Sequence, residues 1–229
     1  VTGGNERVVA EARQRLQRIC DYFGIRGVNW TKVGPPAQES ARCHLTYWSP
    51  RWYTGVDLLP QTQFVGGTAG ASANVALPWS EDRPWVFITL GTSFGQDANF
   101  FVAAAQAAAE LGCLPIVALG GQFKAEQEAA LRAQLPEEAI VEQRVDLNAV
   151  LPNVAAAIHH GGAGVTHALV THAVPQIIVP HAADQMHQAQ GVVRSGVGLH
   201  LPAQQATVDA LVNSLAQILP DLSPFRTAA

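Results

Sequence analysis

The sequence contains few charged residues and no cluster of basic ones. Charged side chains make up 14% of the 229 residues, and 14 lysines and arginines against 18 aspartates and glutamates give a net charge of −4. Affinity for a nucleic-acid backbone requires clustered positive charge. The sequence therefore argues against nucleic acid as a partner.

Cysteine is also scarce, and long apolar runs are absent. The three cysteines, Cys20, Cys43 and Cys113, are widely spaced, which indicates a reducing compartment and gives no metal-ligand spacing. No apolar run approaches the roughly 20 residues of a membrane helix, and the first residues lack the pattern of a signal peptide. We therefore expect a cytoplasmic protein without a transmembrane segment. Because the first residue is a valine and not an initiator methionine, we also expect a fragment.

Hydrophobic residues, at 48%, are numerous enough for a large core, and their arrangement changes near residue 80. Apolar residues at helical spacing predict a helix over Glu6–Phe23, which Gly24 ends by taking a positive φ. The stretch Ile25–Ser80 has no long period and is rich in Trp, Tyr, Pro and Gly. Within it, Cys43–Ser49 and Gln63–Val65 are candidates for short strands.

From Pro84 onward, short apolar strands alternate with helices of about ten residues. This alternation predicts an α/β fold, a Rossmann-like parallel sheet that helices cover on both faces. The predicted strands are Trp85–Leu90, Leu114–Leu119, Ala139–Glu142, Val154–His159, Gln176–Val179 and Val197–His200. The predicted helices are Asp97–Leu111, Ala125–Leu135, Ala163–His172, Asp184–Ser195 and Thr207–Ile218.

Ligands of open parallel sheets bind beyond the carboxyl ends of the strands, and one turn there is rich in glycine. The segment His159–Thr166 holds three glycines within four residues, which lets the backbone approach a ligand closely. The helix from Ala163 points free N–H groups and its positive dipole end at the turn, so a diphosphate is the natural occupant. His159 or His160 would donate a hydrogen bond to a phosphate oxygen. The spacing matches neither a dinucleotide fingerprint nor a P-loop, and tight packing alone also explains such a turn.

Two further turns carry polar side chains that could either bind a ligand or cap a helix. Asp184 and Gln185 suit hydrogen bonds with sugar hydroxyls, although a helix N-cap is the commoner use of such an aspartate. Thr92 and Ser93 suit phosphate oxygens and helix capping equally.

Six of the eight histidines lie between residues 159 and 187, so a metal site is an alternative. Against it, no pair has the i, i+4 spacing of a zinc motif on one helix face; His167 and His172 diverge by roughly 140° around a helix. A hydrolytic nucleophile is weaker still, because no G-x-S-x-G elbow occurs and Cys113 has no basic neighbour in the sequence.

Five segments in the second half match one known signature in composition and separation. They are His159-His160-Gly161-Gly162-Ala163-Gly164, Val174-Pro175-Gln176, Val179-Pro180, Asp184-Gln185 and Gly196-Val197-Gly198. Together they resemble UDP-dependent glycosyltransferases of the GT-B fold, glycosyltransferase family one. Among these, the bacterial macrolide and antibiotic glycosyltransferases are most similar. A weaker resemblance runs from Val86 to about Ile218.

The resemblance implies a role for each matching residue. His159 would contact the phosphates of the donor and stabilise the leaving diphosphate, while Asp184 and Gln185 would hold sugar hydroxyls. Arg144 would cover the nucleobase, and His167 would contact the ribose. The full set of implied donor-binding residues is Thr92, Ser93, Arg144, Val145, His159, Gly161, Gly162, Ala163, Gly164, Val165, His167, Asp184 and Gln185.

Two residues depart from the family pattern. Val165 stands where the family usually has threonine, so a hydroxyl toward the phosphate is lost, and the adjacent Thr166 is expected to point elsewhere. Ala173 stands where the family usually has glycine.

The resemblance also implies a division of the chain. Residues 1–80 would be the tail of an N-terminal acceptor lobe plus the interdomain linker, and residues 81–229 a C-terminal lobe that binds a nucleotide sugar. The parent enzyme would be an inverting glycosyltransferase of the hexosyltransferase class that moves a sugar from a UDP- or TDP-sugar to a small hydroxylated acceptor.

The acceptor would be contacted mainly by the missing lobe, which also holds the family's general base. We therefore expect the chain alone to be inactive. Neither a cofactor nor a metal is implied, because the helix dipole, backbone N–H groups and His159 would stabilise the diphosphate. The alternative is a nucleotide-sugar-binding module with no transfer activity of its own.

Overall fold

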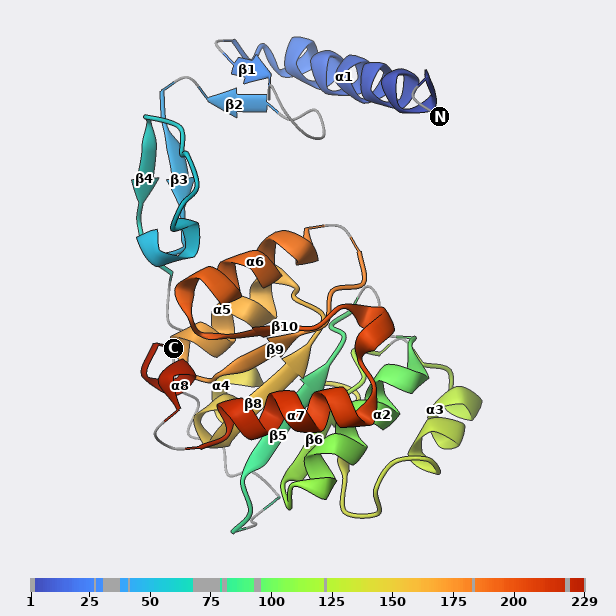
Figure 1. Ribbon diagram of the computed structural model, residues 1–229. Coiled ribbons are helices and arrows are strands. Elements are labelled where there is room, and N and C mark those ends of the chain that lie inside the picture. The colour runs from blue at the N-terminus through green and yellow to red at the C-terminus, as the bar shows by residue number, and fades with distance from the viewer. Residues whose placement is uncertain are drawn as a thin grey trace. The chain divides into compact units, whose positions relative to one another are not determined.

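The computed structural model describes residues 3–26, 28–30, 38–40, 42–67, 79, 82–92, 96–121, 123–182, 184–220 and 223–228 (Figure 1). The chain divides into two compact units. One consists of Val1–Ser49 and Gly55–Gly66, and the other of Pro50–Thr54 and Gly67–Ala229. The short segment Pro50–Thr54 thus belongs to the second unit, although residues of the first unit flank it on both sides.

The first unit begins with the predicted helix, α1 (Gly3–Phe23). Its last turn closes through backbone hydrogen bonds, including one from the Ile25 N–H to the Cys20 carbonyl at 2.9 Å. Gly24 adopts φ +64°, a left-handed conformation that costs glycine nothing and ends the helix as predicted.

Two pairs of short strands follow α1. β3 (His44–Thr46) and β4 (Thr62–Phe64) pair in parallel and overlap the two predicted strand segments. β1 (Val28–Trp30) and β2 (Gln38–Ser40) pair antiparallel and were not predicted.

The second unit is built on a six-stranded sheet in which every described pair is parallel, with the order β10-β9-β8-β5-β6-β7. All six predicted strands are present. Their bounds are β5 Trp85–Thr89, β6 Leu114–Ala118, β7 Ile140–Glu142, β8 Val154–His159, β9 Gln176–Ile178 and β10 Gly198–His200.

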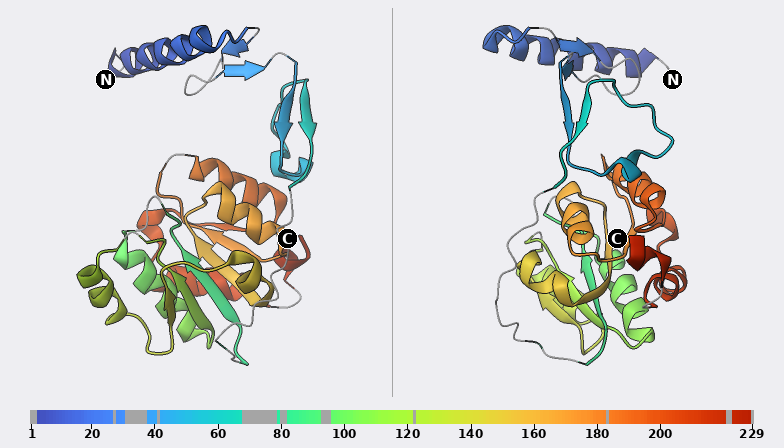
Figure 2. Two further views of the ribbon diagram at one scale, coloured as in Figure 1. Left: turned by 180° about the vertical axis from the view of Figure 1, so that it is seen from behind. Right: turned by 90° about the vertical axis from the view of Figure 1, so that its left-hand side faces the viewer.

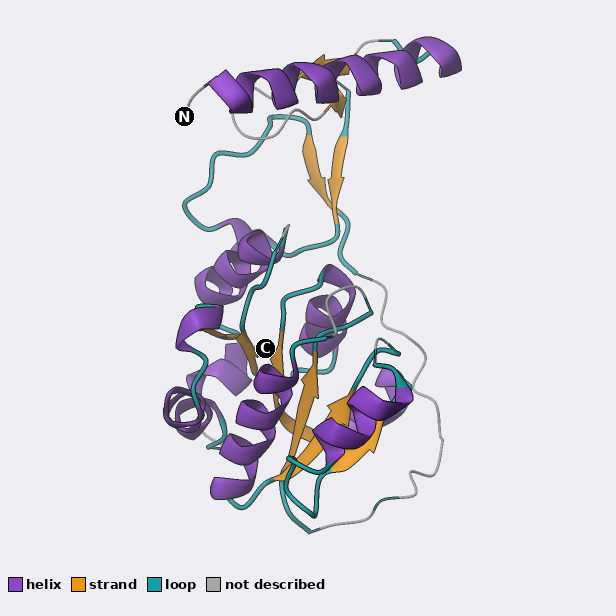
Figure 3. Cartoon of the chain, turned by 90° about the vertical axis from the view of Figure 1, so that its right-hand side faces the viewer, coloured by secondary structure: helices purple, strands orange, loops and turns teal. Residues whose placement is uncertain are grey.

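Helices connect these strands and cover the sheet on both faces, as Figure 2 and Figure 3 show from other sides. The five helices predicted after residue 84 are α2 Ala98–Glu110, α3 Ala125–Arg132, α5 Ala163–Thr171, α6 Gln185–Ser195 and α7 Val208–Ile218. The remaining described helices are α4 Leu147–Val150, α8 Pro224–Ala228 and the 3₁₀ turns Pro50–Tyr53, Leu151–Asn153 and Ala203–Gln205.

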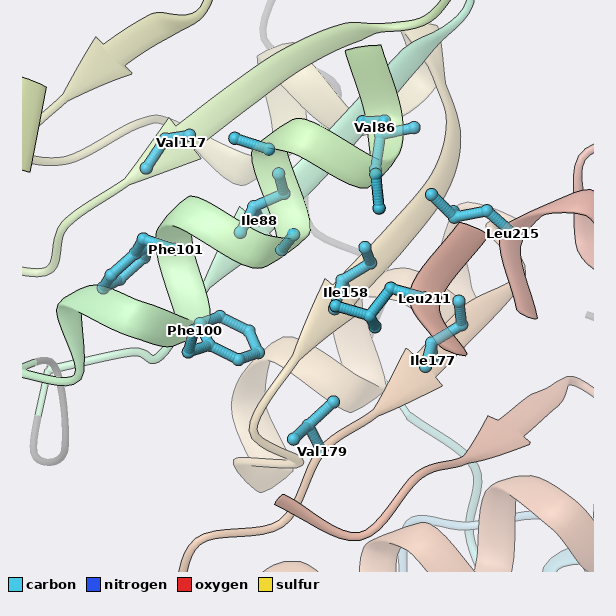
Figure 4. Packing of buried hydrophobic residues seen from close by; sticks show 14 of the residues in the cluster. Val86, Ile88, Phe100, Phe101, Val117, Ile158, Ile177, Val179, Leu211 and Leu215 are labelled. Atoms are coloured by element: carbon cyan, nitrogen blue, oxygen red, sulfur yellow. The ribbon is translucent and has the colours of Figure 1, made fainter. Parts of the chain in front are cut away.

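The core has two parts because successive side chains of β5 point to opposite faces of the sheet. Val86 and Ile88 pack with α2 and α7 (Figure 4), whereas Trp85 and Phe87 pack with α4 and α5. Every residue of β5 is therefore buried, which explains its continuous apolar run. The predicted α/β fold with a parallel sheet is confirmed.

Among the described residues, no helix combines the length and the apolar character that crossing a bilayer requires. The assignment of residues 1–80 to an acceptor lobe and linker, and of residues 81–229 to a donor lobe, stays a prediction.

Candidate functional site

Three strand-to-helix turns lie side by side at the carboxyl edge of the sheet. In the register of the three neighbouring strands, Thr89 of β5 is opposite His159 of β8, and His159 is opposite Ile178 of β9. The chain leaves all three strands at the same level. The described residues that follow them, 90–92 and 96–97, 160–162, and 179–182 with 184, are therefore neighbours although they are far apart in the sequence.

The ring of His160 separates the first two of these turns. A β-carbon on Gly162 would lie 2.5 Å from His160 Nε2, and one on Gly91 would lie 2.7 Å from His160 Cε1. Gly91 also adopts φ +67°, which favours glycine independently. The two glycines thus make room for one imidazole, and His160 sets the distance between the turns.

The side chain of His159 faces the interior of the protein. It is fully buried, its Nε2 lies 2.9 Å from Gln176 Oε1, and its Nδ1 accepts the Gly161 N–H at 3.2 Å. Since Nδ1 accepts, the proton of the neutral ring is on Nε2 and is donated to the glutamine. Burial lowers the pKa of His159 to about 3, with a further contribution from His160. Both ring nitrogens are therefore occupied within the chain, and the predicted contact with a diphosphate would require one of these bonds to break.

His160 is also buried and held neutral. Burial lowers its pKa to about 4, and His181 adds to the shift, while a hydrogen bond with the Thr89 backbone and the charge of Asp184 act in the opposite direction. Its Nδ1 is buried and has no hydrogen-bond partner among the described residues. From the sequence we predicted His160 only as an alternative to His159 for the hydrogen bond to a phosphate oxygen.

The backbone N–H groups at the start of helix α5 face the strand-to-helix turn at residues 160–162. Gly162 occupies the N-cap position without a side-chain cap, so the N–H groups of Ala163 and Gly164 have no intrahelical acceptor. Val165 packs partly against the core, and Thr166 is buried with its hydroxyl donated to the Gly162 carbonyl at 2.9 Å. Thr166 thus points elsewhere, as expected.

The third turn ends at the start of α6. Asp184 is exposed at the N-cap position, but its side chain makes no capping hydrogen bond, which removes capping as its explanation. Gln185 is only 2% exposed. Its Oε1 accepts the N–H groups of His181 and Ala182 at 2.6 and 2.9 Å.

In the first turn, capping is performed by Asp97. Its carboxylate accepts the Phe100 N–H at 3.2 Å at the start of α2, so Thr92 does not cap this helix and is exposed. The other carboxylate oxygen lies 3.4 Å from His181 Nε2. Ser93, which was also predicted to bind the donor, lies outside the described residues.

The predicted nucleobase and ribose residues have different surroundings. The Arg144 guanidinium lies over Gly121, 3.7 Å from the position of a β-carbon there, and is exposed. Val145 packs partly against the core beneath β5 and β6. The ring of His167 lies directly against Gly67.

Metal binding and nucleophilic hydrolysis, the two alternatives considered from the sequence, have little support in the described part of the chain. No group of three histidine, cysteine, aspartate or glutamate side chains there is arranged to hold a metal ion. Burial raises the pKa of the Cys113 thiol, which keeps it protonated and unsuited to nucleophilic attack.

Comparison with known proteins finds a matching family. The C-terminal domain described as "Erythromycin biosynthesis protein CIII-like" matches residues 116–229. Over these residues the chain is similar to that family. Aklavinone 7-beta-L-rhodosaminyltransferase of Streptomyces galilaeus is 38% identical to this chain over 103 residues, which are 45% of the chain and 23% of that protein.

A second relative, the 3-alpha-mycarosylerythronolide B desosaminyl transferase of Saccharopolyspora erythraea, is 31% identical over 151 residues. The match covers 65% of this chain and 35% of that protein. The chain thus spans between about a quarter and about a third of the length of these two relatives. Both are named as sugar transferases, which confirms the resemblance to antibiotic glycosyltransferases.

Solved structures of glycosyltransferases share the fold. The glycosyltransferase VinC in complex with dTDP is 27% identical, with a TM-score of 0.56 over 69% of this chain and 39% of that one. The glycotransferase of kitacinnamycin is 20% identical, with a TM-score of 0.73 over 97% of this chain and 59% of that one. The second likeness shows the fold alone, and together they confirm the GT-B architecture.

Proposed function

We propose that the chain is the donor-binding part of an inverting glycosyltransferase that moves a sugar from a UDP- or TDP-sugar to a small hydroxylated acceptor. The observation that carries the proposal is the meeting of three turns at the carboxyl ends of β5, β8 and β9, beside the uncapped first turn of α5. Ligands of parallel α/β sheets bind at this edge. The relatives named as sugar transferases give the proposal its chemical class.

In this proposal the diphosphate binds at the N-terminus of α5. The N–H groups of Ala163, Gly164 and Val165 and the positive end of the helix dipole neutralise its charge. Thr92 and Ser93 add hydroxyl groups from the first turn. Val165 has no hydroxyl group. The backbone therefore contributes more of the diphosphate binding than in family members that have threonine at this position.

The two histidines take different parts. His159 acts through the Gly161 N–H that it accepts, and so fixes the turn on which the leaving diphosphate rests. His160 lies between Gly91 and Gly162 and holds the two turns apart, while its Nδ1, which has no hydrogen-bond partner among the described residues, is buried. Leaving-group stabilisation thus rests mainly on the N–H groups of α5, which need no metal or cofactor.

The remainder of the donor follows the neighbouring turns. Arg144 covers the nucleobase and Val145 binds its edge through the backbone, while His167 contacts the ribose. Asp184, whose exposed carboxylate caps no helix, accepts hydrogen bonds from sugar hydroxyls.

Transfer itself needs a group that this chain does not supply in our proposal. The acceptor oxygen attacks the anomeric carbon, the bond from that carbon to the β-phosphate oxygen breaks, and the nucleoside diphosphate leaves with the electron pair. The proton of the acceptor hydroxyl goes to a base on the acceptor lobe. The alternative function is a nucleotide-sugar-binding module without transfer activity of its own. A cytoplasmic location belongs to the same proposal and is supported by three cysteines that form no disulfide.

Thermal unfolding with added ligands tests the proposal. We expect UDP or TDP to raise the midpoint temperature of unfolding of the 229-residue chain. Zinc chloride should leave this temperature unchanged. Stabilisation by zinc without any effect of either nucleotide would reverse the interpretation. Sugar transfer by the chain alone would refute the assignment of the base to another lobe and leave donor binding intact.

A further inference from the structure

A glutamine and a histidine lie side by side in the apolar interior of the sheet. His159 is the last residue of β8 and Gln176 the first residue of β9, and both are 0% exposed. The residues next to them along the strands, Ile158 and Ile177, are fully buried apolar side chains. Burying a polar side chain costs free energy unless it is hydrogen-bonded. Core packing alone therefore does not account for this pair.

The direction of each hydrogen bond in the pair follows from the backbone. The Gly161 N–H can only donate, so His159 Nδ1, at 3.2 Å, is an acceptor and carries no proton. Burial lowers the pKa of His159 to about 3, so the ring is neutral at pH 7 and its single proton is on Nε2. Nε2 therefore donates, and the Gln176 atom 2.9 Å away is the amide oxygen.

The amide nitrogen of Gln176 is buried and has no hydrogen-bond partner among the residues that the structure describes. An N–H group without an acceptor inside a protein reduces its stability. Turning the amide over would place its N–H groups against the Nε2 proton of His159 and would break the bond between the two side chains. The amide orientation is therefore determined by His159 and retained at a cost in stability.

The neighbouring strands hold Gln176 in place. It is opposite Ala157 of β8 and Gly198 of β10. A β-carbon on Gly198 would lie 1.9 Å from the Gln176 carbonyl oxygen, so a glycine is needed for β10 to lie this close. Three of the five signature segments, those that contain His159, Gln176 and Gly198, thus meet at one place in the sheet.

His159 connects Gln176 with the glycine-rich turn. Gly161 adopts φ +91°, and a β-carbon there would lie 2.7 Å from Ile178 Cγ2. Its N–H is accepted by His159 Nδ1, and the next residue is Gly162, the N-cap of α5. A proton on Nδ1 would face the Gly161 N–H with a second donor, and this bond would be lost. The orientation of the turn thus depends on which ring nitrogen carries the proton.

We infer that Gln176 is a positioning residue that keeps the proton of His159 on Nε2 and so holds the turn before α5 in the orientation that receives a diphosphate. The last step of the inference rests on the proposed donor-binding function. Gln176 acts through His159 and not by contact with the donor. Without its oxygen the Nε2 proton has no acceptor, so the tautomer with the proton on Nδ1 becomes populated and the Gly161 N–H is released.

The test uses Gln176→Met, which keeps the length of the side chain and removes its oxygen, in the 229-residue chain. Two-bond ¹H–¹⁵N correlation spectra of the imidazoles show which nitrogen of His159 carries the proton, and the Gly161 amide resonance reports its hydrogen bond. Calorimetric titration gives the affinity for thymidine diphosphate. Gln188→Met is the matched control, because Gln188 is also buried and its Oε1 has no hydrogen-bond partner among the described residues.

We expect Gln176→Met to populate both tautomers of His159, to move the Gly161 amide resonance and to lower the affinity for thymidine diphosphate about fivefold or more. The control should resemble the unchanged chain in all three measurements. A His159 proton that stays on Nε2, or an affinity that does not change, would overturn the inference. If the unchanged chain does not bind thymidine diphosphate, it is the proposed function that fails, and the imidazole signals still decide whether Gln176 controls His159.

A double-substitution cycle tests whether Gln176 acts through His159. In His159→Asn the side-chain oxygen can accept the Gly161 N–H in place of Nδ1 and needs no support from Gln176. Gln176→Met should therefore lower the affinity no further in this background. A further loss as large as that in the unchanged chain would contradict the inference. If Gln176→Met does not fold, Gln176→Asn keeps an amide and withdraws its oxygen by one methylene group, with the same expected results.

Discussion

The imidazole of His160 fills the space that a β-carbon on Gly162 would need, with 2.5 Å between that position and Nε2. The same ring lies against Gly91 in the turn after β5. One side chain thus acts as a spacer between two turns that approach each other at the carboxyl edge of the sheet. The absence of a side chain at both glycines is as much a part of the site as the histidine is.

Gly162→Ala is expected to destabilise the protein by about 1–3 kcal/mol, because the added methyl group overlaps the buried ring of His160. Urea unfolding measures the change. Gly164→Ala is the stability control, since a β-carbon there meets nothing within 4 Å, and it should stabilise α5 by up to about 1 kcal/mol. Equal stability of Gly162→Ala and the unchanged chain would contradict the packing described here.

Stability should fall as the pH is lowered from about 6.5 toward 4. The pKa values of His159 and His160 are lowered to about 3 and about 4 in the folded protein, against about 6.5 in the unfolded chain. Below pH 6.5 the unfolded state binds protons that the folded state does not, so the free energy of unfolding decreases. Each histidine contributes a slope of up to about 1.4 kcal/mol per pH unit. Well above the unfolded pKa of about 6.5, both are neutral in both states and contribute little slope.

Urea unfolding between pH 7.5 and 4.5 gives this dependence, and His160→Asn provides the comparison. The variant lacks one titrating group, so its stability should depend less steeply on pH than that of the unchanged chain. Parallel curves for the two proteins would show that His160 is not held neutral by the fold.

Ala173→Gly should stabilise the protein by about 1 kcal/mol. Ala173 has φ +53°, which makes it the one described non-glycine residue with a positive φ. A left-handed conformation costs an L-residue roughly 1–2 kcal/mol and costs glycine far less, although glycine is more flexible when unfolded. Ala130→Gly in helix α3, where the backbone is regular, should instead destabilise by about 1 kcal/mol. The two substitutions should therefore shift the urea midpoint in opposite directions, and a shift in the same direction would contradict the prediction.

Asp184→Ala should lower the affinity for thymidine diphosphate glucose several-fold. The affinity for thymidine diphosphate should be unchanged or slightly higher, since a negative charge is removed near the diphosphate. Calorimetric titration measures both. Asp184→Asn, which keeps an acceptor oxygen, should fall between Asp184→Ala and the unchanged chain. An equal loss for both ligands would remove Asp184 from its proposed contact with the sugar.

Much of the fold follows from local sequence patterns. The buried run of β5 and the alternation of strands and helices after it predict the parallel sheet, and Asp97 marks the start of α2 as a capping residue should. The family's glycine at the position of Ala173 also acquires a physical reason, because the backbone there is left-handed.

The internal contacts of the site could not be predicted in the same way. The partner of His159 is Gln176, 17 residues away, and that of His181 is Asp97, 84 residues away. Such pairs depend on which strands become neighbours in the sheet, and no local pattern contains that information. The Gln185 oxygen likewise meets its two N–H groups only because of how the turn after β9 folds back.

The most direct test of donor binding at the start of α5 is a ¹⁵N-labelled NMR titration of the 229-residue chain with thymidine diphosphate. We expect the largest amide shifts at Gly161, Gly162, Ala163 and Gly164, with smaller ones at Gly91 and Thr92. Shifts that cluster on another edge of the sheet, or an unchanged spectrum at millimolar nucleotide, would contradict donor binding at α5.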